Sequence, residues 1–186
     1  MYEGKLIRLR EMRMEDAEQF VVWMNNRDTA DKLTGGSMPL TLQQERDWIS
    51  QNAGRREDQC TFSVETLDGR HIGSCGYHQL DWKNRRAMVG WSIGDPQMRG
   101  KGYGADMIET LLKVCFEVQG LRKVSLNVYE FNEAIRLYER LGFVLEGVFR
   151  KERYVRGQWW DERHYGMFKT EWAAKRGITL NGDEVS

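Results

Sequence analysis

The chain has 186 residues, in which 28 Lys and Arg residues balance 28 Asp and Glu residues. This length fits one domain with a real core, and the charge balance gives no reason to expect direct nucleic-acid binding. Cys60, Cys75 and Cys115 form no CxxC pair, so we expect reduced core thiols rather than a zinc or disulfide framework. No apolar run reaches 18 residues and the first residues, MYEGKLIRLR, have no apolar h-region, so we expect a soluble, cytoplasmic protein without a membrane partner.

The first third of the chain predicts one strand and two helices. Apolar and polar residues alternate over 5–12, as in a half-buried strand, and 12–26 carry apolar residues at helical spacing. Residues 29–40 contain Gly35-Gly36 and Pro39, so we expect a loop there. Thr41 is expected to cap a second helix over 42–53, with Glu45 placed for the capping contact.

Strands dominate the rest of the chain. Alternating runs joined at Asp68-Gly69 predict a hairpin, and 87–95 add a third antiparallel strand. Further along, the pattern predicts a helix with apolar positions from Ala105 to Phe116, a strand over 123–130, a helix over 132–143 ended by Gly142, and strands over 144–156 and 159–170 that turn at Arg156-Gly157.

This order predicts an α/β (α+β) fold. A helix between 87–95 and 123–130 makes those strands parallel neighbours, in an otherwise antiparallel sheet. We therefore expect a mixed sheet of six to seven strands with one parallel pair and about four helices. One domain should span 1–176, and 177–186 should form a polar, flexible tail.

Residues 97–112, QMRGKGYGADMIETLL, place three glycines and two cations directly before a predicted helix. A helix N-terminus presents unpaired backbone NH groups, and glycines let an anion approach them. Arg99 and Lys101 can add charge to such a site. A P-loop fits poorly because no Ser or Thr follows the lysine, and GKGYG lacks the GxGxxG spacing of a dinucleotide-binding turn.

The spacing Gln97-x-x-Gly100-x-Gly102 resembles the pyrophosphate loop of the GNAT superfamily of acetyl-CoA-dependent N-acetyltransferases. A second block, 127–143, is similar to the other half of the family's signature, with Asn132, Ala134, Tyr138 and Gly142-Phe143 in the expected order. The resemblance runs from Leu6 to about Trp172. It is greatest to the branch that holds ribosomal-protein alanine N-acetyltransferases and spermidine N-acetyltransferases.

The resemblance implies a site for acetyl-CoA between two splayed parallel strands, here around 91–93 and 127–130. Splaying leaves backbone groups unpaired, and the pantetheine amides are expected to pair with them. A backbone NH near Ile93 is expected to polarise the thioester carbonyl. The cofactor-binding residues that the resemblance implies are Ile93, Gln97, Arg99, Gly100, Lys101, Gly102, Tyr103, Gly104 and Asn132. Asn132 also fits an ordinary helix N-cap, and both roles can hold at once.

Tyr138 is the expected catalytic acid. A phenol with a pKa of about 10 can protonate a departing thiolate of similar basicity. Spacing alone also fits packing, since Ala134, Tyr138 and Leu141 share one helical face, but the match to the family motif favours chemistry.

The residue that deprotonates the amine is open. Glu130 and Glu152 are the catalytic candidates, while Asp28 and Asp81 lie in predicted loops that can reach the site. Each carboxylate singly fits a solvated surface role, and a water chain can replace all of them. His71, His78 and His164 are isolated from one another, so we assign no metal.

These observations predict an enzyme that moves acetyl from acetyl-CoA directly to a primary amine. Neither motif contains a cysteine for a covalent intermediate. The expected acceptor is a protein N-terminal amine, such as that of a ribosomal protein, or a polyamine such as spermidine. An amino-sugar or aminoglycoside acceptor, a non-catalytic acetyl-CoA sensor and a nucleotide-binding protein remain alternatives. A homodimer is expected by analogy.

Overall fold

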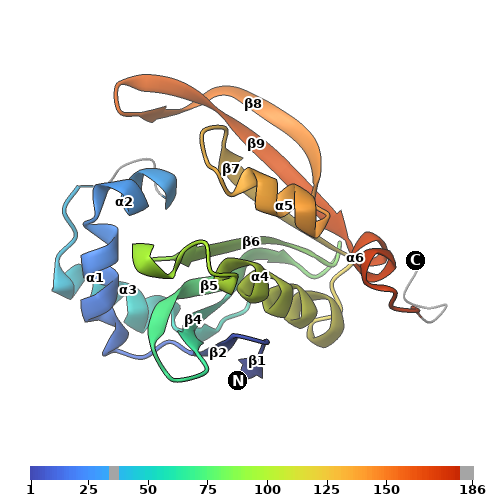
Figure 1. The fold of residues 1–186 in the computed structure, drawn as a ribbon, viewed down its shortest axis with the longest axis horizontal. Helices are drawn as coiled ribbons and strands as arrows, with labels where there is room; N and C mark the ends of the chain where they lie inside the picture. The colour runs from blue at the N-terminus through green and yellow to red at the C-terminus, as the bar shows by residue number, and fades with distance from the viewer. Residues whose placement is uncertain (34–37, 181–186) are drawn as a thin grey trace.

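The structure is a computed structural model that describes residues 1–33 and 38–180. One nine-stranded sheet runs through the molecule in the order β1-β2-β4-β5-β6-β7-β9-β8, with β3 beside β4. Its strands are β1 (Tyr2–Glu3), β2 (Ile7–Glu11), β3 (Gly54–Arg55), β4 (Cys60–Thr66), β5 (His71–Asp81), β6 (Arg86–Ile93), β7 (Lys123–Tyr129), β8 (Val144–Val155) and β9 (Gln158–Phe168). Among these strands, β6 and β7 form the one parallel pair (Figure 1), which confirms the predicted mixed fold. The prediction of six to seven strands was too low, because the short strands β1 and β3 had no sequence pattern of their own.

The helices exceed the predicted number within the described ranges. They are α1 (Asp16–Met24), α2 (Arg27–Leu33), α3 (Leu42–Asn52), α4 (Tyr103–Lys113), α5 (Ile135–Leu141) and α6 (Lys169–Arg176). A π-helical turn over Val114–Val118 extends α4. The prediction of a loop over 29–40 was wrong for its first residues, which belong to α2, and the predicted strand end at 169–170 is helical. Gly35-Gly36 lie outside the described residues.

The predicted turns and caps largely agree with the structure. Gly69 and Gly142 have positive φ, at the hairpin turn and at the end of α5. Thr41 caps α3, but its capping partner is Gln44 rather than Glu45. Gln44 is the third residue of the helix, where a side chain reaches back to the cap NH, whereas Glu45 is buried. Of the predicted tail, Gly177 ends α6, and 181–186 lie outside the described part of the chain.

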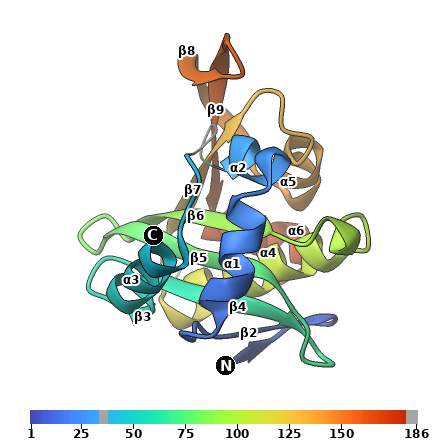
Figure 2. The same cartoon turned by 90° about the vertical axis from the view of Figure 1, so that its left-hand side faces the viewer.

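Helices cover the two faces of the sheet because neighbouring strand residues point to opposite sides. On β4, Val64 packs in the main core with Ile108 and Leu111 of α4, whereas Ser63 reaches Asp16 of α1 on the other face. A smaller core joins α1 to α3. Figure 2 shows α1, α2 and α3 on the side nearest the viewer, with the β8–β9 hairpin projecting beyond them.

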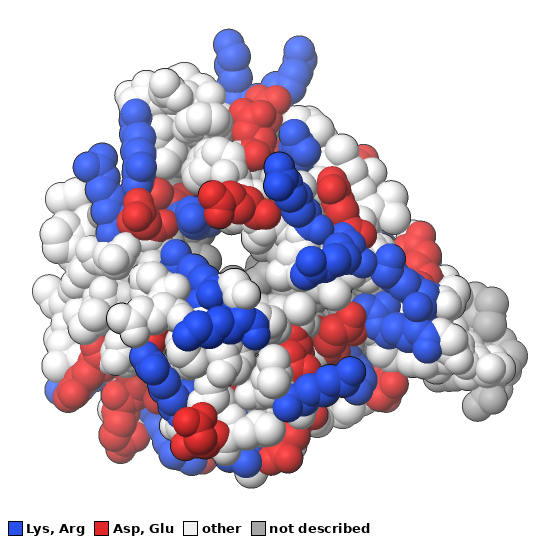
Figure 3. All heavy atoms as spheres, viewed as in Figure 1, with Lys and Arg blue, Asp and Glu red and all other residues white. Residues whose placement is uncertain are grey.

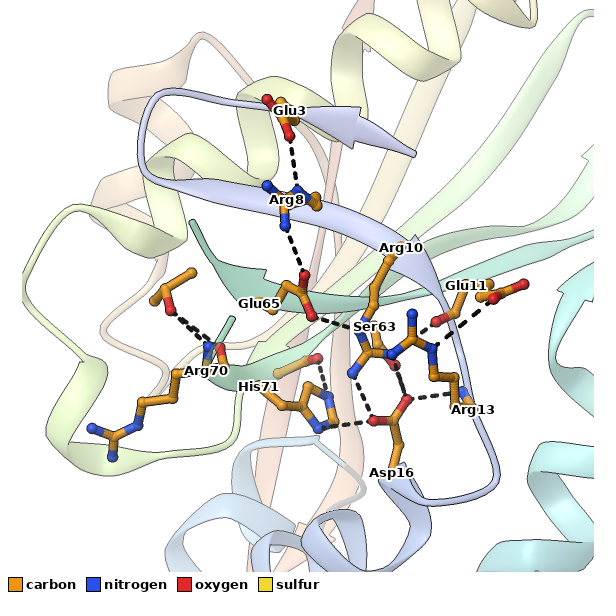
Figure 4. A network of polar contacts seen from close by, with 12 residues as sticks. Glu3, Arg8, Arg10, Glu11, Arg13, Asp16, Ser63, Glu65, Arg70 and His71 are labelled. Carbon is orange, nitrogen blue, oxygen red and sulfur yellow. Dashed lines mark hydrogen bonds and ion pairs between the residues drawn. The ribbon is translucent and has the colours of Figure 1, made fainter. Parts of the chain in front are cut away.

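A buried ionic network holds α1 on the sheet (Figure 4). Arg10 of β2 donates to both carboxylate oxygens of Asp16, at 2.7 and 2.8 Å, and its Nε donates to Glu65 at 2.7 Å. Burial alone would raise the pKa of Asp16, but hydrogen bonds from Arg10, the Arg13 NH and Ser63 together hold that pKa well below its ordinary value. Asp16 is therefore a fixed anion, and α1 has one position on the sheet.

Two further contacts position the elements that carry the motifs. Asp106 in the first turn of α4 accepts the backbone NH groups of Lys5, Leu6 and Ile7, at 3.0, 2.7 and 3.1 Å. The N-terminus of α4 is thereby tied to the start of β2. On the opposite face, Trp23 of α1 packs on the bend after β6, where a Cβ added to Gly94 would lie 2.1 Å from the Trp23 ring.

Candidate active site

The parallel strands β6 and β7 separate part-way along their length. They pair from Arg86↔Lys123 to Met88↔Ser125, and β6 then continues to Ile93 and β7 to Tyr129 without further pairing. Figure 1 shows the result as a V, with β7, β8, β9 and α5 on one arm and β6 and the remaining strands on the other. The predicted splay is therefore present.

The backbone of β6 directs hydrogen-bonding groups into this split. Gly94 donates to the Ile72 carbonyl at 2.9 Å, which makes Ile72 and Gly94 a hydrogen-bonded pair of the antiparallel β5–β6 ladder. Because such pairs alternate along the ladder, the NH and carbonyl groups of Trp91 and Ile93 point away from β5, toward β7. The expectation for the Ile93 NH is consistent with this direction.

The glycine segment opens the helix α4 beside the split. Gly100 and Gly102 have φ values of +74° and +90°, in the left-handed region where a side chain is disfavoured. Gly102 is the N-cap residue, and the NH groups of the first turn that follows have no partner within the helix. A row of backbone donors therefore faces the adjoining cleft.

This first cleft has a volume of about 500 Å³, within the size range of small-molecule sites. Its wall contains six of the nine cofactor residues implied by the sequence motifs, namely Ile93, Arg99, Gly100, Gly102, Gly104 and Asn132. Gln97, Lys101 and Tyr103 do not line it. Gln97 lies in a short turn where its NH donates to Asp95. The donor row and the cation Arg99 suit a diphosphate.

Arg99 makes contacts that the sequence did not indicate. Its guanidinium donates to the Ile93 carbonyl, at 3.2 Å from Nε and 3.1 Å from one terminal nitrogen, and to the Thr29 hydroxyl at 2.9 Å. It therefore links the end of β6 to α2. Asn132 accepts the Ala134 NH at 3.0 Å in the turn before α5 and lines the cleft. The N-cap residue of α5 is Ala134, so the alternative of Asn132 as the helix N-cap was wrong.

Tyr138 lies where the split meets α5. Its side chain is buried, and its hydroxyl accepts a hydrogen bond of 3.1 Å from the Trp91 indole. Burial raises the pKa of Tyr138, and the Trp91 bond partly opposes that shift. The phenol is therefore protonated at neutral pH and available as a proton donor.

A second cleft, of about 520 Å³, lies on the other side of the split. Asn127 and Tyr129 of β7 face it together with their β9 partners His164 and Glu162, because paired residues share one face of a sheet. The opposite face of β9 meets α5, where Tyr165 donates to Glu139. The residues common to both clefts are Lys32, Leu33, Trp91, Asn132 and Tyr138.

The carboxylates named from the sequence lie outside both clefts. Glu130 accepts the Asp161 NH at 3.1 Å, and Glu152 is exposed on β8. The carboxylate that lines the second cleft is Glu162, which is 5% exposed and was missed. Its strand had been predicted, but three consecutive charged residues, 161–163, hid which of them faces inward. The pairing of Glu162 with Tyr129 decides that.

The open end of the V is bridged. Arg156, in the turn of the β8–β9 hairpin, forms ion pairs with Asp28, at 2.8 Å, and Asp31 of α2. Asp28 is thus engaged with the hairpin, while Asp81 binds Asn84 and Arg86 elsewhere. Figure 3, which has the viewpoint of Figure 1, shows a hollow near the centre of the molecule's surface, with Lys or Arg side chains along the lower and right-hand border of the hollow.

The thiols lie outside this chemistry. Burial raises the pKa values of Cys75 and Cys115, and Cys60 is also buried. In residues 1–33 and 38–180, no group of three or more metal-binding side chains is placed to hold a metal ion. The same ranges contain no helix long and apolar enough to cross a membrane.

Comparison with known proteins agrees with this geometry. Residues 7–144 match the family model described as an acetyltransferase (GNAT) domain. An uncharacterized N-acetyltransferase of Bacillus subtilis, YokL, is 30% identical over 140 residues, which cover 75% of this chain and 77% of the relative. A putative ribosomal N-acetyltransferase of the same organism, YdaF, is 34% identical over 110 residues, covering 59% and 60% of the two chains.

Among solved structures, spermidine N-acetyltransferase from Vibrio cholerae in complex with CoA and spermine superimposes with a TM-score of 0.81. It is 23% identical and covers 89% of this chain and 97% of its own, so it supports the fold. The split sheet, the glycine-led helix and the family model support the same assignment, because the split and the start of the helix both lie within the residues that the family model matches. This chain therefore belongs to the GNAT acetyltransferase family and is an acetyl-CoA-dependent N-acetyltransferase of that type.

Proposed function

We propose that the enzyme transfers acetyl from acetyl-CoA to the N-terminal amine of a peptide or protein, by direct attack of the amine. The observation that carries this proposal is the meeting of two clefts at Trp91 and Tyr138. One cleft has the donor row of α4, and the other opens on the opposite face of the sheet. An acyl donor and an amine can therefore approach one point from two sides.

The chain's own groups divide the work of binding. The NH groups that begin α4 hold the diphosphate, with Gly104 leaving room for it. Acetyl-CoA supplies the acetyl thioester. The backbone NH and carbonyl of Trp91, which face the split, pair with the pantetheine amides of acetyl-CoA. The Ile93 carbonyl is already bonded to Arg99, and the Ile93 NH binds the thioester oxygen as negative charge develops there. Gln97, Lys101 and Tyr103 lie outside the first cleft and stay predictions as cofactor contacts.

Tyr138 completes the reaction as the acid. The amine nitrogen bonds to the acetyl carbon, the carbon–sulfur bond breaks, and the Tyr138 hydroxyl gives its proton to the sulfur. An acceptor that binds as an ammonium group first loses one proton to water or to a base, which frees the lone pair for attack. After attack the nitrogen loses a second proton in the same way, and Tyr138 is reprotonated from solvent. The buried thiols, with their raised pKa values, support direct transfer over an acyl-cysteine route.

Charge in the second cleft favours a peptide over a polyamine. Among the described residues, Lys32 and Arg153 line this cleft beside one carboxylate, Glu162, so these three side chains together carry a net positive charge. A polyamine carries several positive charges and would meet an excess of positive charge. Spermidine remains the second candidate because a relative from Vibrio cholerae, 30% identical over 67% of this chain, is named spermidine N(1)-acetyltransferase. An amino-sugar acceptor has no comparable support.

A thiol-release assay with acetyl-CoA tests this proposal. N-terminal peptides, spermidine, amino-sugars and an acceptor-free blank form the panel, and we expect turnover with peptides. Tyr138→Phe should lower kcat about 10²- to 10⁴-fold while CoA affinity is retained. Binding of CoA without turnover on any amine would instead support the sensor alternative.

A cytoplasmic location and a homodimer remain predictions. The β8–β9 hairpin exposes Val148, Phe149, Tyr154 and Trp159, each between 46% and 60% exposed, which fits burial against a second copy. Sedimentation velocity at several protein concentrations tests the dimer, and a single monomer boundary throughout would refute it.

A further inference from the structure

One ion pair in the second cleft has an orientation suited to binding a ligand. Glu162 accepts from Nε of Arg153 at 3.0 Å and from the Asn127 amide at 3.4 Å. A carboxylate has about four acceptor positions, so these two bonds leave capacity for an ammonium group. Asn127 is itself fixed by His164, at 2.6 Å. The Glu162 carboxylate is therefore held in place by its neighbours.

Arg153 keeps one edge of its guanidinium available. Only Nε contacts Glu162, and no residue in the described ranges bonds to the two terminal nitrogens. The side chain is 47% exposed, against 7% for that of Glu162, so the available edge belongs to the member of the pair that a ligand can reach from solvent. Two parallel N–H groups of an arginine match the two oxygens of a carboxylate. Lys32 of α2 adds a second cation to the same cleft.

Strand register gives the position of the Arg153–Glu162 pair along the split between β6 and β7. Counting on from the last β6–β7 pair, Met88↔Ser125, places Ser92 level with Tyr129, and Tyr129 pairs with Glu162. An amine that contacts Glu162 therefore lies level with the separated part of β6. The carboxylate is at the height where the acyl group would lie, on the face from which the amine arrives.

We propose that the preferred acceptor carries a carboxylate close to its amine, with Glu162 binding the ammonium group and Arg153 the carboxylate. This inference rests on the proposed function. The two protein charges are 3.0 Å apart, so the two ligand charges must also be separated by only a few bonds. A peptide with an acidic residue next to its N-terminus has this chemistry, and so has a free amino acid. We favour the peptide, because the 47% exposure of the Arg153 side chain leaves room for a longer chain to continue past it.

The test compares acceptors that differ in charge alone. With wild-type enzyme, kcat/KM for Ala-Asp-amide should exceed that for Ala-Asn-amide about 10- to 100-fold, since a hydrogen bond to a charged group contributes about 1.5–3 kcal/mol. Ala-Lys-amide and spermidine should be poorer still. A free amino acid such as β-alanine distinguishes the source: if it exceeds the dipeptide, the carboxylate requirement holds and the acceptor is a small molecule.

Variants then assign the roles. Arg153→Gln should abolish the preference for Ala-Asp-amide over Ala-Asn-amide, and Arg153→Glu should reverse it toward Ala-Lys-amide. Glu162→Gln should raise KM for every amine while KM for acetyl-CoA stays unchanged. Because Arg153→Gln leaves Glu162 without its cation, the double variant Arg153→Gln/Glu162→Gln is included and thermal melting is recorded. Arg150→Gln, an exposed site on the same strand and outside both clefts, is the matched control.

Three outcomes separate this inference from the proposed function. Equal turnover of Ala-Asp-amide and Ala-Asn-amide, or an unchanged preference in folded Arg153→Glu, would overturn the inference and leave acetyl transfer intact. CoA binding with no thiol release on any acceptor would overturn the proposed function itself.

Discussion

Replacing Gly104 with Ala separates the binding role of the glycine segment from its structural role. Gly104 lies in the first turn of α4, lines the first cleft and has no positive φ. A Cβ added there would lie 3.8 Å from a Leu137 methyl group, an ordinary contact, so the fold can accept it. Alanine in a helix is more stable than glycine by about 0.5–1 kcal/mol.

The same methyl group should weaken cofactor binding, because it occupies the surface on which the diphosphate is expected to lie. Displacing one charge-assisted hydrogen bond removes about 1.5–3 kcal/mol, or about 10- to 100-fold in affinity. Calorimetric titration with CoA and KM for acetyl-CoA measure this loss. Thermal melting should show an equal or higher Tm, by up to about 2–4 °C for a domain of this size.

Gly102→Ala provides the contrast. Its φ of +90° lies in the left-handed region, so this variant should lose stability as well as affinity. A folded Gly104→Ala protein that binds CoA as tightly as wild type would refute the placement of the diphosphate on α4. A Gly104→Ala protein with a markedly lower Tm would show instead that the glycine is needed for packing.

Three further outcomes are expected. Trp91→Phe removes the 3.1 Å hydrogen bond to the Tyr138 hydroxyl, so kcat should fall about fivefold to tenfold for a bond of about 1 kcal/mol. An unchanged kcat in steady-state kinetics would show that Trp91 does not assist Tyr138 as the acid. Gly94→Ala places a Cβ 2.1 Å from the Trp23 ring, so the free energy of unfolding measured in urea should fall by about 1–3 kcal/mol. Gly90→Ala is the control, because its Cβ would have its nearest neighbour at 4.0 Å, and its free energy of unfolding should fall less. Equal decreases in the two variants would contradict the packing argument. Burial lowers the pKa values of His71 and His78, so their contribution to stability is complete above about pH 6.5 and is lost as pH falls from there toward the folded-state pKa values. Unfolding titrations at pH 7.5 and 5.5 should show a lower free energy of unfolding at the lower pH. If a His71→Gln/His78→Gln protein keeps the full pH dependence, these residues are not its source.

Local signals account for the parts of the fold that were predicted correctly. The turn at Asp68-Gly69, the Gly142 cap and the helix after Gly102 each depend on neighbouring residues and on glycine at a positive φ. Where the local signal was ambiguous, the prediction failed. Residues 29–33 contain no breaker of their own, and the glycine pair beyond them extended the predicted loop over part of α2. Glu45 and Gln44 compete for one cap, and only helix geometry selects Gln44.

The sequence alone was enough to predict the mixed sheet, the glycine-led helix and the family resemblance. Each of these depends on residue types and their spacing within short stretches of the chain and on the order of those stretches. Tertiary structure decided the meeting of Trp91 with Tyr138, the contact of Arg99 with Thr29 of α2, and the lining of the second cleft by Glu162 rather than Glu130 or Glu152. Each of these brings together segments that are far apart in the sequence. Strand register and the separation of β6 from β7 fix them, and neither can be derived from any one segment of the chain.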